Sequence, residues 1–253
     1  MKRILSYLGI TLSFYLVFLI ATLPAERAYD WFKAQVPNIK VYALDGSVWS
    51  ARADAIEIDG QVLREFEWSI RLMSLFMGRV ESEISFDNNA SWAKGSVGKS
   101  LLSGDILVKD LTGQVSAEEL QSMLPSIPAK LGGSFQLTFD DLAYSTDASV
   151  LTLAEGYVDW RDASVTVLQK AAIGDFQVDL TTTDLGISGV FSDANAGPLS
   201  VQGSLTLSPD KTYQVDATLN VRDKSRQDLV QSLRFLGQQD ARGNVTFSQG
   251  GSL

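Results

Sequence analysis

The chain has 253 residues, of which 45% are apolar and 20% charged, and its net charge is −9. This composition predicts a folded protein with one large or two modest domains. The chain contains no cysteine and no histidine, which excludes the common zinc sites and Ser-His or Cys-His catalysis. Nucleic-acid binding is not expected, because an acidic chain lacks the basic surface that phosphate contacts require.

The first segment of the sequence predicts a membrane anchor. Residues 4–23 are uncharged and mainly apolar, and as a helix they would span the roughly 30 Å of a bilayer's hydrocarbon core. Lys2 and Arg3 precede this run, so residues 1–3 are predicted to be a cytoplasmic tail and the rest to lie across the membrane. A cleaved signal peptide is the alternative, but its cleavage site would have Leu23 where a small residue is required.

Residues 24–36 are predicted to form a juxtamembrane helix that continues from the anchor and stops before Pro37. The helix carries Tyr29, Trp31 and Phe32, and tyrosine and tryptophan concentrate at membrane–water interfaces. The alternative is that these aromatic side chains pack against the domain that follows.

Residues 37–253 are predicted to form one periplasmic β-rich domain, and a subdivision near residues 125–132 is left open. Apolar and polar residues alternate here, which is typical of antiparallel strands with one buried face and one solvated face. The clearest alternating runs are Val80–Phe86, Phe135–Phe139, Phe176–Leu180, Val201–Leu207, Tyr213–Val221 and Val245–Phe247. The predicted fold is therefore mainly β: an N-terminal transmembrane helix, then a large, curved antiparallel β-sheet that forms a groove, a sandwich or an open barrel-like structure.

Turn residues separate these runs. The candidates are Asp45-Gly46, Asp59-Gly60, Asp87-Asn88-Asn89, Gly132-Gly133 and Ser208-Pro209-Asp210. At the second of them, a two-residue loop places Ile58 opposite Gln61, and a three-residue loop places it opposite Val62. Asp45-Gly46 is expected to open the strand that carries Trp49.

Two short helices are expected in the β-rich region. One follows a capping box at Ser116–Glu119, in which the serine hydroxyl accepts a backbone N–H of the first turn. The other carries an apolar stripe over Leu229–Leu236 and ends at Gly237, with a weaker capping box at Ser225–Asp228.

Neither catalytic, nor cofactor-binding, nor metal-binding residues are predicted. Asp140, Asp141 and Asp147 offer the oxygen ligands that hard cations prefer, but such clusters are more often solvated hairpin ends. Asp193-x-Asn195-x-Gly197 begins like a calcium loop, but the twelfth position is Ser204 instead of glutamate. Core packing is the default expectation for the five tryptophans, and Trp49 and Trp68 either fill a closed core or line an open trough.

Several segments resemble protein N of the bacterial type II secretion system. They are LDGSVWSARA (44–53), FEWSIRLMSLFMGRVESEIS (66–85), GYVDWRDASV (156–165) and LRFLGQQDARGNVTFSQGGSL (233–253). The resemblance implies an inner-membrane accessory subunit, without enzymatic activity or cofactor, of the machine that exports folded proteins across the outer membrane of Gram-negative bacteria. It also implies that other inner-membrane subunits of this apparatus are the partners.

Two functions therefore stay open. The first is a structural or interaction subunit of the secretion apparatus, attached to the inner membrane by one transmembrane helix. The second is a periplasmic β-groove that binds or transfers lipid, which requires a solvent-open trough lined by aliphatic and aromatic side chains. The two differ in whether the apolar face of the sheet is covered.

Overall fold

The computed structural model describes residues 7, 11–12, 15, 18–75, 77–101, 103–123, 129–166 and 170–252. About half of the predicted anchor at residues 4–23 lies outside this part of the chain, as does the stretch around Pro125 where the first predicted helix should end. None of the helices in the described ranges combines the length and the apolar character needed to cross a bilayer. The transmembrane anchor therefore remains a prediction.

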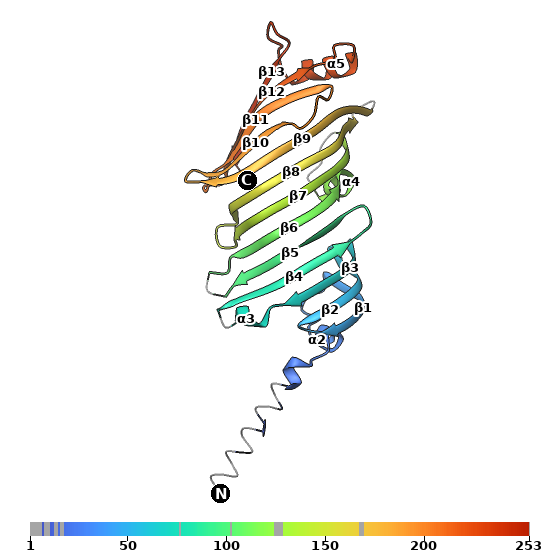
Figure 1. Cartoon of the computed structure of the whole chain (residues 1–253), viewed down its shortest axis with the longest axis vertical. Helices are drawn as coiled ribbons and strands as arrows, with labels where there is room; N and C mark the ends of the chain where they lie inside the picture. Colours follow the sequence, from blue (N-terminus) through green and yellow to red (C-terminus); the bar gives the residue numbers. More distant parts are fainter. Residues whose placement is uncertain are drawn as a thin grey trace. The chain divides into compact units, whose positions relative to one another are not determined.

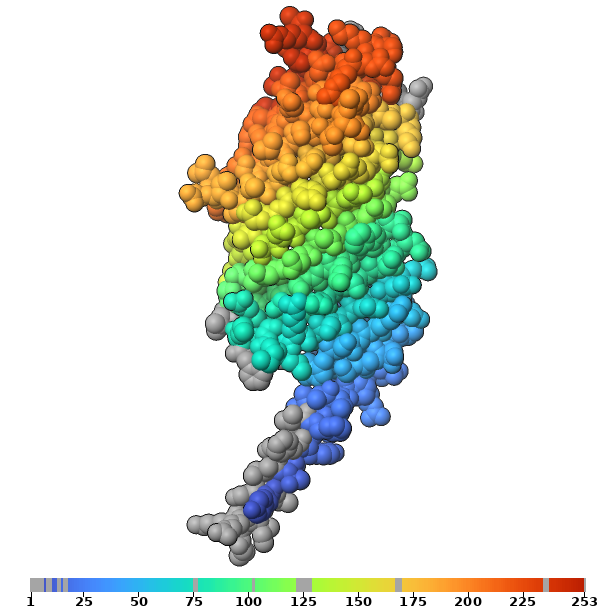
Figure 2. All heavy atoms as spheres, in the orientation of Figure 1, coloured from blue at the N-terminus to red at the C-terminus, as the bar shows by residue number. Residues whose placement is uncertain are grey.

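The chain divides into two compact units, Met1–Asn88 and Asn89–Leu253. Each unit is an antiparallel sheet of one layer, in which strands lie side by side in the order of the sequence (Figure 1). The successive bands of colour in Figure 2 follow the same order within the second unit. The prediction of a mainly β, antiparallel fold is confirmed. The single layer within each unit argues against the sandwich alternative.

The first unit consists of α2 (Ala25–Phe32), β1 (Ile39–Ser47), β2 (Ser50–Ile58), β3 (Gln61–Ile70), α3 (Leu72–Leu75) and β4 (Arg79–Asp87). Ile58 pairs with Gln61, so the loop between β2 and β3 has two residues. These are Asp59 and Gly60, with φ values of 50° and 86°. Both are left-handed, as a type I′ hairpin turn requires.

The other predicted turn in this unit, Asp45-Gly46, is wrong. Both residues lie within β1, opposite Arg52 and Ala51, and the chain reverses at Val48-Trp49 instead. A Cβ atom on Gly46 would stand 2.5 Å from the Ser50 carbonyl oxygen, so glycine permits close approach of β2 to β1. Trp49 therefore lies in a turn and not in a strand.

The outer edge of β1 is covered by α2 and by the residue before it. The Tyr29 hydroxyl donates to the carbonyl oxygen of Ile39 (3.0 Å) and accepts the N–H of Val41 (3.3 Å). Pro24 forms an isolated antiparallel bridge with Ser47. Pro24 is extended, with ψ of 136°, so it separates α2 from the helical residues before it, and α2 ends at Phe32 instead of Gln35.

In the second unit, the described residues form nine strands and two helices. They are β5 (Trp92–Ser100), β6 (Ile106–Ser116), α4 (Ala117–Met123), β7 (Lys130–Ser145), β8 (Val150–Thr166), β9 (Lys170–Thr183), β10 (Gly186–Asp193), β11 (Leu199–Leu207), β12 (Thr212–Val221), α5 (Gln227–Leu236) and β13 (Val245–Ser252).

Ser116 caps α4 as expected, because its hydroxyl accepts the N–H of Glu119 at 3.2 Å. Ser225 does not cap α5; its hydroxyl donates to Asp223 at 2.6 Å. Gly132-Gly133, predicted as a turn, lies inside β7 at a shift of register.

The buried core of the second unit gathers under α5. Leu229 and Leu233, one turn apart, are 5% and 4% exposed. They pack with buried residues of the neighbouring strands: Ala163, Ile173, Leu199, Val221 and Val245. The helix therefore covers one end of the apolar face of the sheet.

An ion pair holds the connection between β10 and β11. Arg222 pairs with Asp193 and donates to the carbonyl oxygens of Asn195 (3.3 Å) and Gly197 (3.1 Å). Asp193 also accepts the N–H of Val201 and the hydroxyl of Ser200, both at 3.1 Å. Burial alone would raise the pKa of Asp193, but the hydrogen bonds from Arg222, Val201 and Ser200 outweigh it and lower the pKa.

We expect Gly60→Val to lower the free energy of unfolding by about 1–2 kcal/mol, because a side chain in left-handed backbone is strained. Gly60→Asn is the control, since asparagine adopts this conformation readily and nothing lies within 4 Å of an added Cβ atom. Denaturant unfolding of the detergent-solubilised chain measures both. An equal loss in both variants would contradict the role of backbone conformation.

We expect Arg222→Met to destabilise the chain by about 1–3 kcal/mol at neutral pH, because the Asp193 carboxylate, 11% exposed, loses its partner. Since the folded pKa of Asp193 is lowered, its contribution is complete above the ordinary carboxyl value of about 4 and disappears as pH falls through the lower folded value. The stability difference between the wild type and Asp193→Asn should therefore shrink in acid. A difference that does not depend on pH would contradict this account.

Candidate functional site

Two of the acidic groups noted in the sequence form ion pairs within the fold, and Asp140 lies in β7. Asp141 pairs with Lys109 across the β6–β7 ladder at 3.2 Å, and Asp193 is held by Arg222. Asp147 lies in the turn between β7 and β8. Within the described ranges, no three carboxylate, histidine or cysteine side chains gather as a metal site would require.

The strand register in the second unit separates an apolar face from a polar one. Directly paired residues of antiparallel strands lie on the same face. One row of paired residues crosses β6–β13 and consists of Gly113, Leu137, Val158, Val178, Phe191, Gly203, Ala217 and Phe247. The adjacent row, on the opposite face, consists of Gln114, Gln136, Asp159, Gln177, Ser192, Gln202, Thr218 and Thr246.

An aromatic row lies on the same apolar face, nearer one end of the strands. Trp160 of β8 stacks on Phe135 of β7, with ring centres 5.2 Å apart, and contacts Phe176 of β9 at 6.0 Å. The indole N–H donates to the carbonyl oxygen of Gly132 at 3.0 Å, so its polar atom is satisfied. The rings of Trp160 and Phe176 pack against the cluster that α5 covers.

Among the described residues, no second sheet covers the apolar face beyond α5. The side chains of Leu137, Val158, Val178, Phe191 and Phe247 are half-buried, and the single-layered sheet of this unit has no second sheet packed on it. The apolar face is therefore only partly covered in the described part of this unit.

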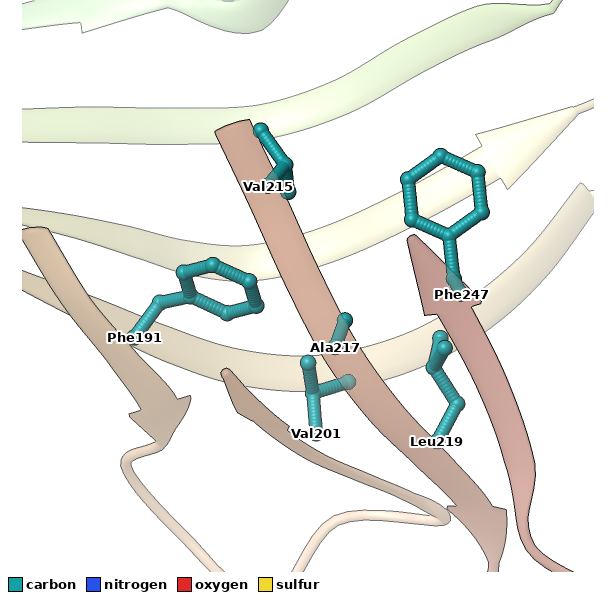
Figure 3. A pocket seen from close by; sticks show the side chains of 6 residues that line it. All are labelled: Phe191, Val201, Val215, Ala217, Leu219 and Phe247. Atoms are coloured by element: carbon teal, nitrogen blue, oxygen red, sulfur yellow. The ribbon is translucent and has the colours of Figure 1, made fainter. Parts of the chain in front are cut away.

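A cavity of about 300 Å³ lies in this face (Figure 3). It is lined by Phe191, Val201, Val215, Ala217, Leu219 and Phe247, and none of these side chains carries a polar atom. Phe191 and Phe247 stand at the two ends of a paired row whose middle members, Gly203 and Ala217, are small. A Cβ atom on Gly203 would lie 2.4 Å from the Phe191 ring, so glycine lets this ring lie over the sheet.

The chemistry of the cavity follows from its lining. Aliphatic and aromatic walls without donors or acceptors suit a hydrocarbon chain or an apolar side chain, and they give no group for acid–base or nucleophilic chemistry. Sequence reasoning missed this cavity. The feature that marks the cavity is a cross-strand row in which Phe191 and Phe247 flank two small residues. This row forms only when four strands pair in the correct register, so it cannot be read from one segment of the sequence.

The tryptophans do not form a common core. Trp31 and Trp92 are 64% and 40% exposed, which contradicts the expectation of core packing for these two. Trp49 and Trp68 are half-buried in the first unit. Each donates its indole N–H to a backbone carbonyl, Trp49 to Ile20 at 2.9 Å and Trp68 to Val48 at 3.0 Å. They therefore fix the Val48-Trp49 turn and do not line a site.

The last strand offers a second candidate surface, its outer edge. Within the part of the chain that the structure describes, this edge meets one isolated bridge, from Gln239 to Val245. The remainder, Thr246–Ser252, contains no charge and no proline, the residues that usually protect an edge strand. Its backbone groups are available to an added strand.

Comparison with known proteins assigns this β-sheet protein to a family. The family described as "Type II secretion system (T2SS), protein N" matches residues 37–248. The chain is 26% identical to type II secretion system protein N of Vibrio cholerae and 25% identical to the protein of that name from Aeromonas hydrophila, with 100% of each chain covered. No solved structure matches. The match to the family extends over most of the chain, and the protein belongs to the type II secretion system protein N family.

Proposed function

We propose that the chain is an accessory subunit of the type II secretion apparatus that supports export of folded proteins across the outer membrane. A single span at residues 4–23 attaches it to the inner membrane, and residues 37–253 lie in the periplasm. Full-length similarity to two relatives named as protein N of this system carries the proposal. Lys2 and Arg3 before the apolar segment support the orientation.

The exposed aromatics of α2 suit this location. Trp31 is 64% exposed and Phe32 is 55% exposed. Both lie shortly after the predicted anchor, where the bilayer surface would be. Tryptophan is favoured in the headgroup region, where its ring meets both apolar and wet surroundings. Tyr29, in contrast, is committed to the edge of β1.

The edge of β13 is the surface that we assign to a partner subunit. An extended segment of another inner-membrane component can add a strand there through backbone hydrogen bonds. Such docking needs neither a catalytic group nor a cofactor, in agreement with the absence of enzymatic activity that the sequence predicts.

We expect deletion of the gene to reduce the secreted enzymes in the culture supernatant and to retain them in the periplasm. Re-expression of Thr246→Lys should not restore export or co-purification with inner-membrane subunits, because lysine on an edge strand opposes strand addition. Thr218→Lys is the matched control: Thr218 is paired with Thr246, on the same face, but lies one strand further from the edge. Unchanged export after deletion would overturn the proposed function, and full rescue by Thr246→Lys would overturn the role of the edge.

Lipid binding is a second candidate function, and the open cavity on the apolar face favours it. Its six lining side chains present carbon alone over about 300 Å³, and the face continues across β6–β13. A hydrocarbon chain would gain burial here without leaving a polar group of the protein unsatisfied.

We expect Val215→Asp to lower capture of a photoreactive acyl-chain lipid by about tenfold or more, because a carboxylate in the cavity must be desolvated when the chain binds. Val190→Asp is the control, since Val190 lies on the polar face and is 57% exposed. The full-length chain in lipid nanodiscs serves for both, with circular dichroism to verify the fold. Equal capture by the two variants would exclude the cavity as the lipid site.

A further inference from the structure

In the connection between β3 and β4, apolar side chains are exposed and a polar side chain is buried. Met73 and Met77 are 73% and 75% exposed, whereas Ser74 between them is only 8% exposed. The Ser74 hydroxyl donates to the carbonyl oxygen of Arg71 at 2.8 Å, and the N–H of Met77 donates to the carbonyl of Ser74 at 3.0 Å. The loop's own hydrogen bonds therefore place its polar side chain inside and its methionines outside.

Leu72 adds to this surface, since it is 45% exposed. Single exposed apolar residues are ordinary in soluble proteins, but a group of them within one loop marks a contact with something apolar. Methionine is the flexible, polarizable side chain that adapts to an irregular apolar environment.

The same end of the sheet holds the end of the predicted anchor. The N–H of Ile70, the last residue of β3, donates to the carbonyl of Trp49 at 2.6 Å. The indole of Trp49 donates in turn to the carbonyl of Ile20 at 2.9 Å. The chain of contacts therefore runs from the start of the α3 connection to the last helical turn before Leu23, and Figure 1 shows both at one end of the first unit.

Charges near the loop do not oppose an approach to a membrane. The guanidinium of Arg71 binds the carboxylates of Glu81 at 2.8 Å and of Glu83 at 2.5 Å, which offsets part of their repulsion from anionic headgroups. Arg79, at the start of β4, is exposed and adds a positive charge on the far side of the loop.

We propose that Leu72, Met73 and Met77 form a second membrane contact, in which their side chains enter the interfacial region of the bilayer that holds the anchor. The inference rests on the proposed anchor, because the bilayer is placed by the end of residues 4–23. The second contact restricts rotation and tilt of the first unit about its single span.

The test uses single-cysteine variants of the full-length chain, which has no cysteine of its own. Met73→Cys and Met77→Cys are labelled with an environment-sensitive fluorophore and reconstituted in vesicles of phosphatidylethanolamine and phosphatidylglycerol. Val62→Cys is the matched control: it is 44% exposed and lies at the far end of β3, about 30 Å away by strand length. Alkaline carbonate extraction of the same vesicles tests the anchor separately.

At positions 73 and 77 we expect blue-shifted emission, quenching by nitroxide-labelled lipid and protection from aqueous iodide. At position 62 we expect the emission of a water-exposed label, quenching by iodide and no quenching by the lipid. If the chain resists extraction but all three labels behave like position 62, the second contact is overturned and the anchor stands. The labels would also behave like position 62 if Leu72, Met73 and Met77 contact a partner protein instead of lipid, because the vesicles contain no other protein. If carbonate releases the chain, the anchor and the second contact are both overturned.

Discussion

In-register pairing from β6 to β13 is the constraint on which the second unit depends. Side chains alternate between faces along a strand, so a slip of one residue would exchange the row from Gly113 to Phe247 with the row from Gln114 to Thr246. The bulges in β7 and β8 change register without destroying this separation. Because α5 covers one end of the apolar face, the pairing of the strands creates both the small core and the half-buried apolar rows beyond it.

The first unit shows how one turn serves several attachments. The Val48-Trp49 turn receives the indole of Trp68 and the N–H of Ile70 from β3. The same turn donates the indole of Trp49 to Ile20 and the N–H of Val48 to Leu23. Two tryptophans that in the sequence suggest the walls of a binding site therefore act as hydrogen-bond donors: Trp68 links β3 to the turn, and Trp49 links the turn to the segment that precedes the sheet.

Local sequence rules predicted strands such as β12, since alternation such as Tyr213–Val221 needs no knowledge of neighbouring strands. They also predicted the start of α4, because the Ser116 cap is a contact within one turn. They failed where the same residues serve two purposes. Asp-Gly makes a left-handed turn at residues 59–60, but at residues 45–46 it lies in a strand, where Gly46 allows the β2 backbone to come close. Sequence alone does not separate these cases.

Non-local features were beyond such rules for a physical reason. The cavity requires Phe191, Gly203, Ala217 and Phe247 to fall in one row, and this depends on three successive ladder registers. The α3 helix is four residues long, too short to show a helical period. The family resemblance, in contrast, was recognisable from loosely spaced segments along the whole chain, because it did not require knowledge of any contact.

The hydroxyl of Tyr29 has a consequence for how copies of this protein can associate. It occupies both a donor and an acceptor on the free side of β1, and Pro24 closes the other end of that strand without an N–H to offer. A fibre that grows head to tail by strand addition needs a free edge on both the first and the last strand. Since both ends of β1 are already occupied, in the described part of the chain the outer edge of β13 is the better template for strand addition between copies, which favours a pair joined through two β13 strands over an open polymer.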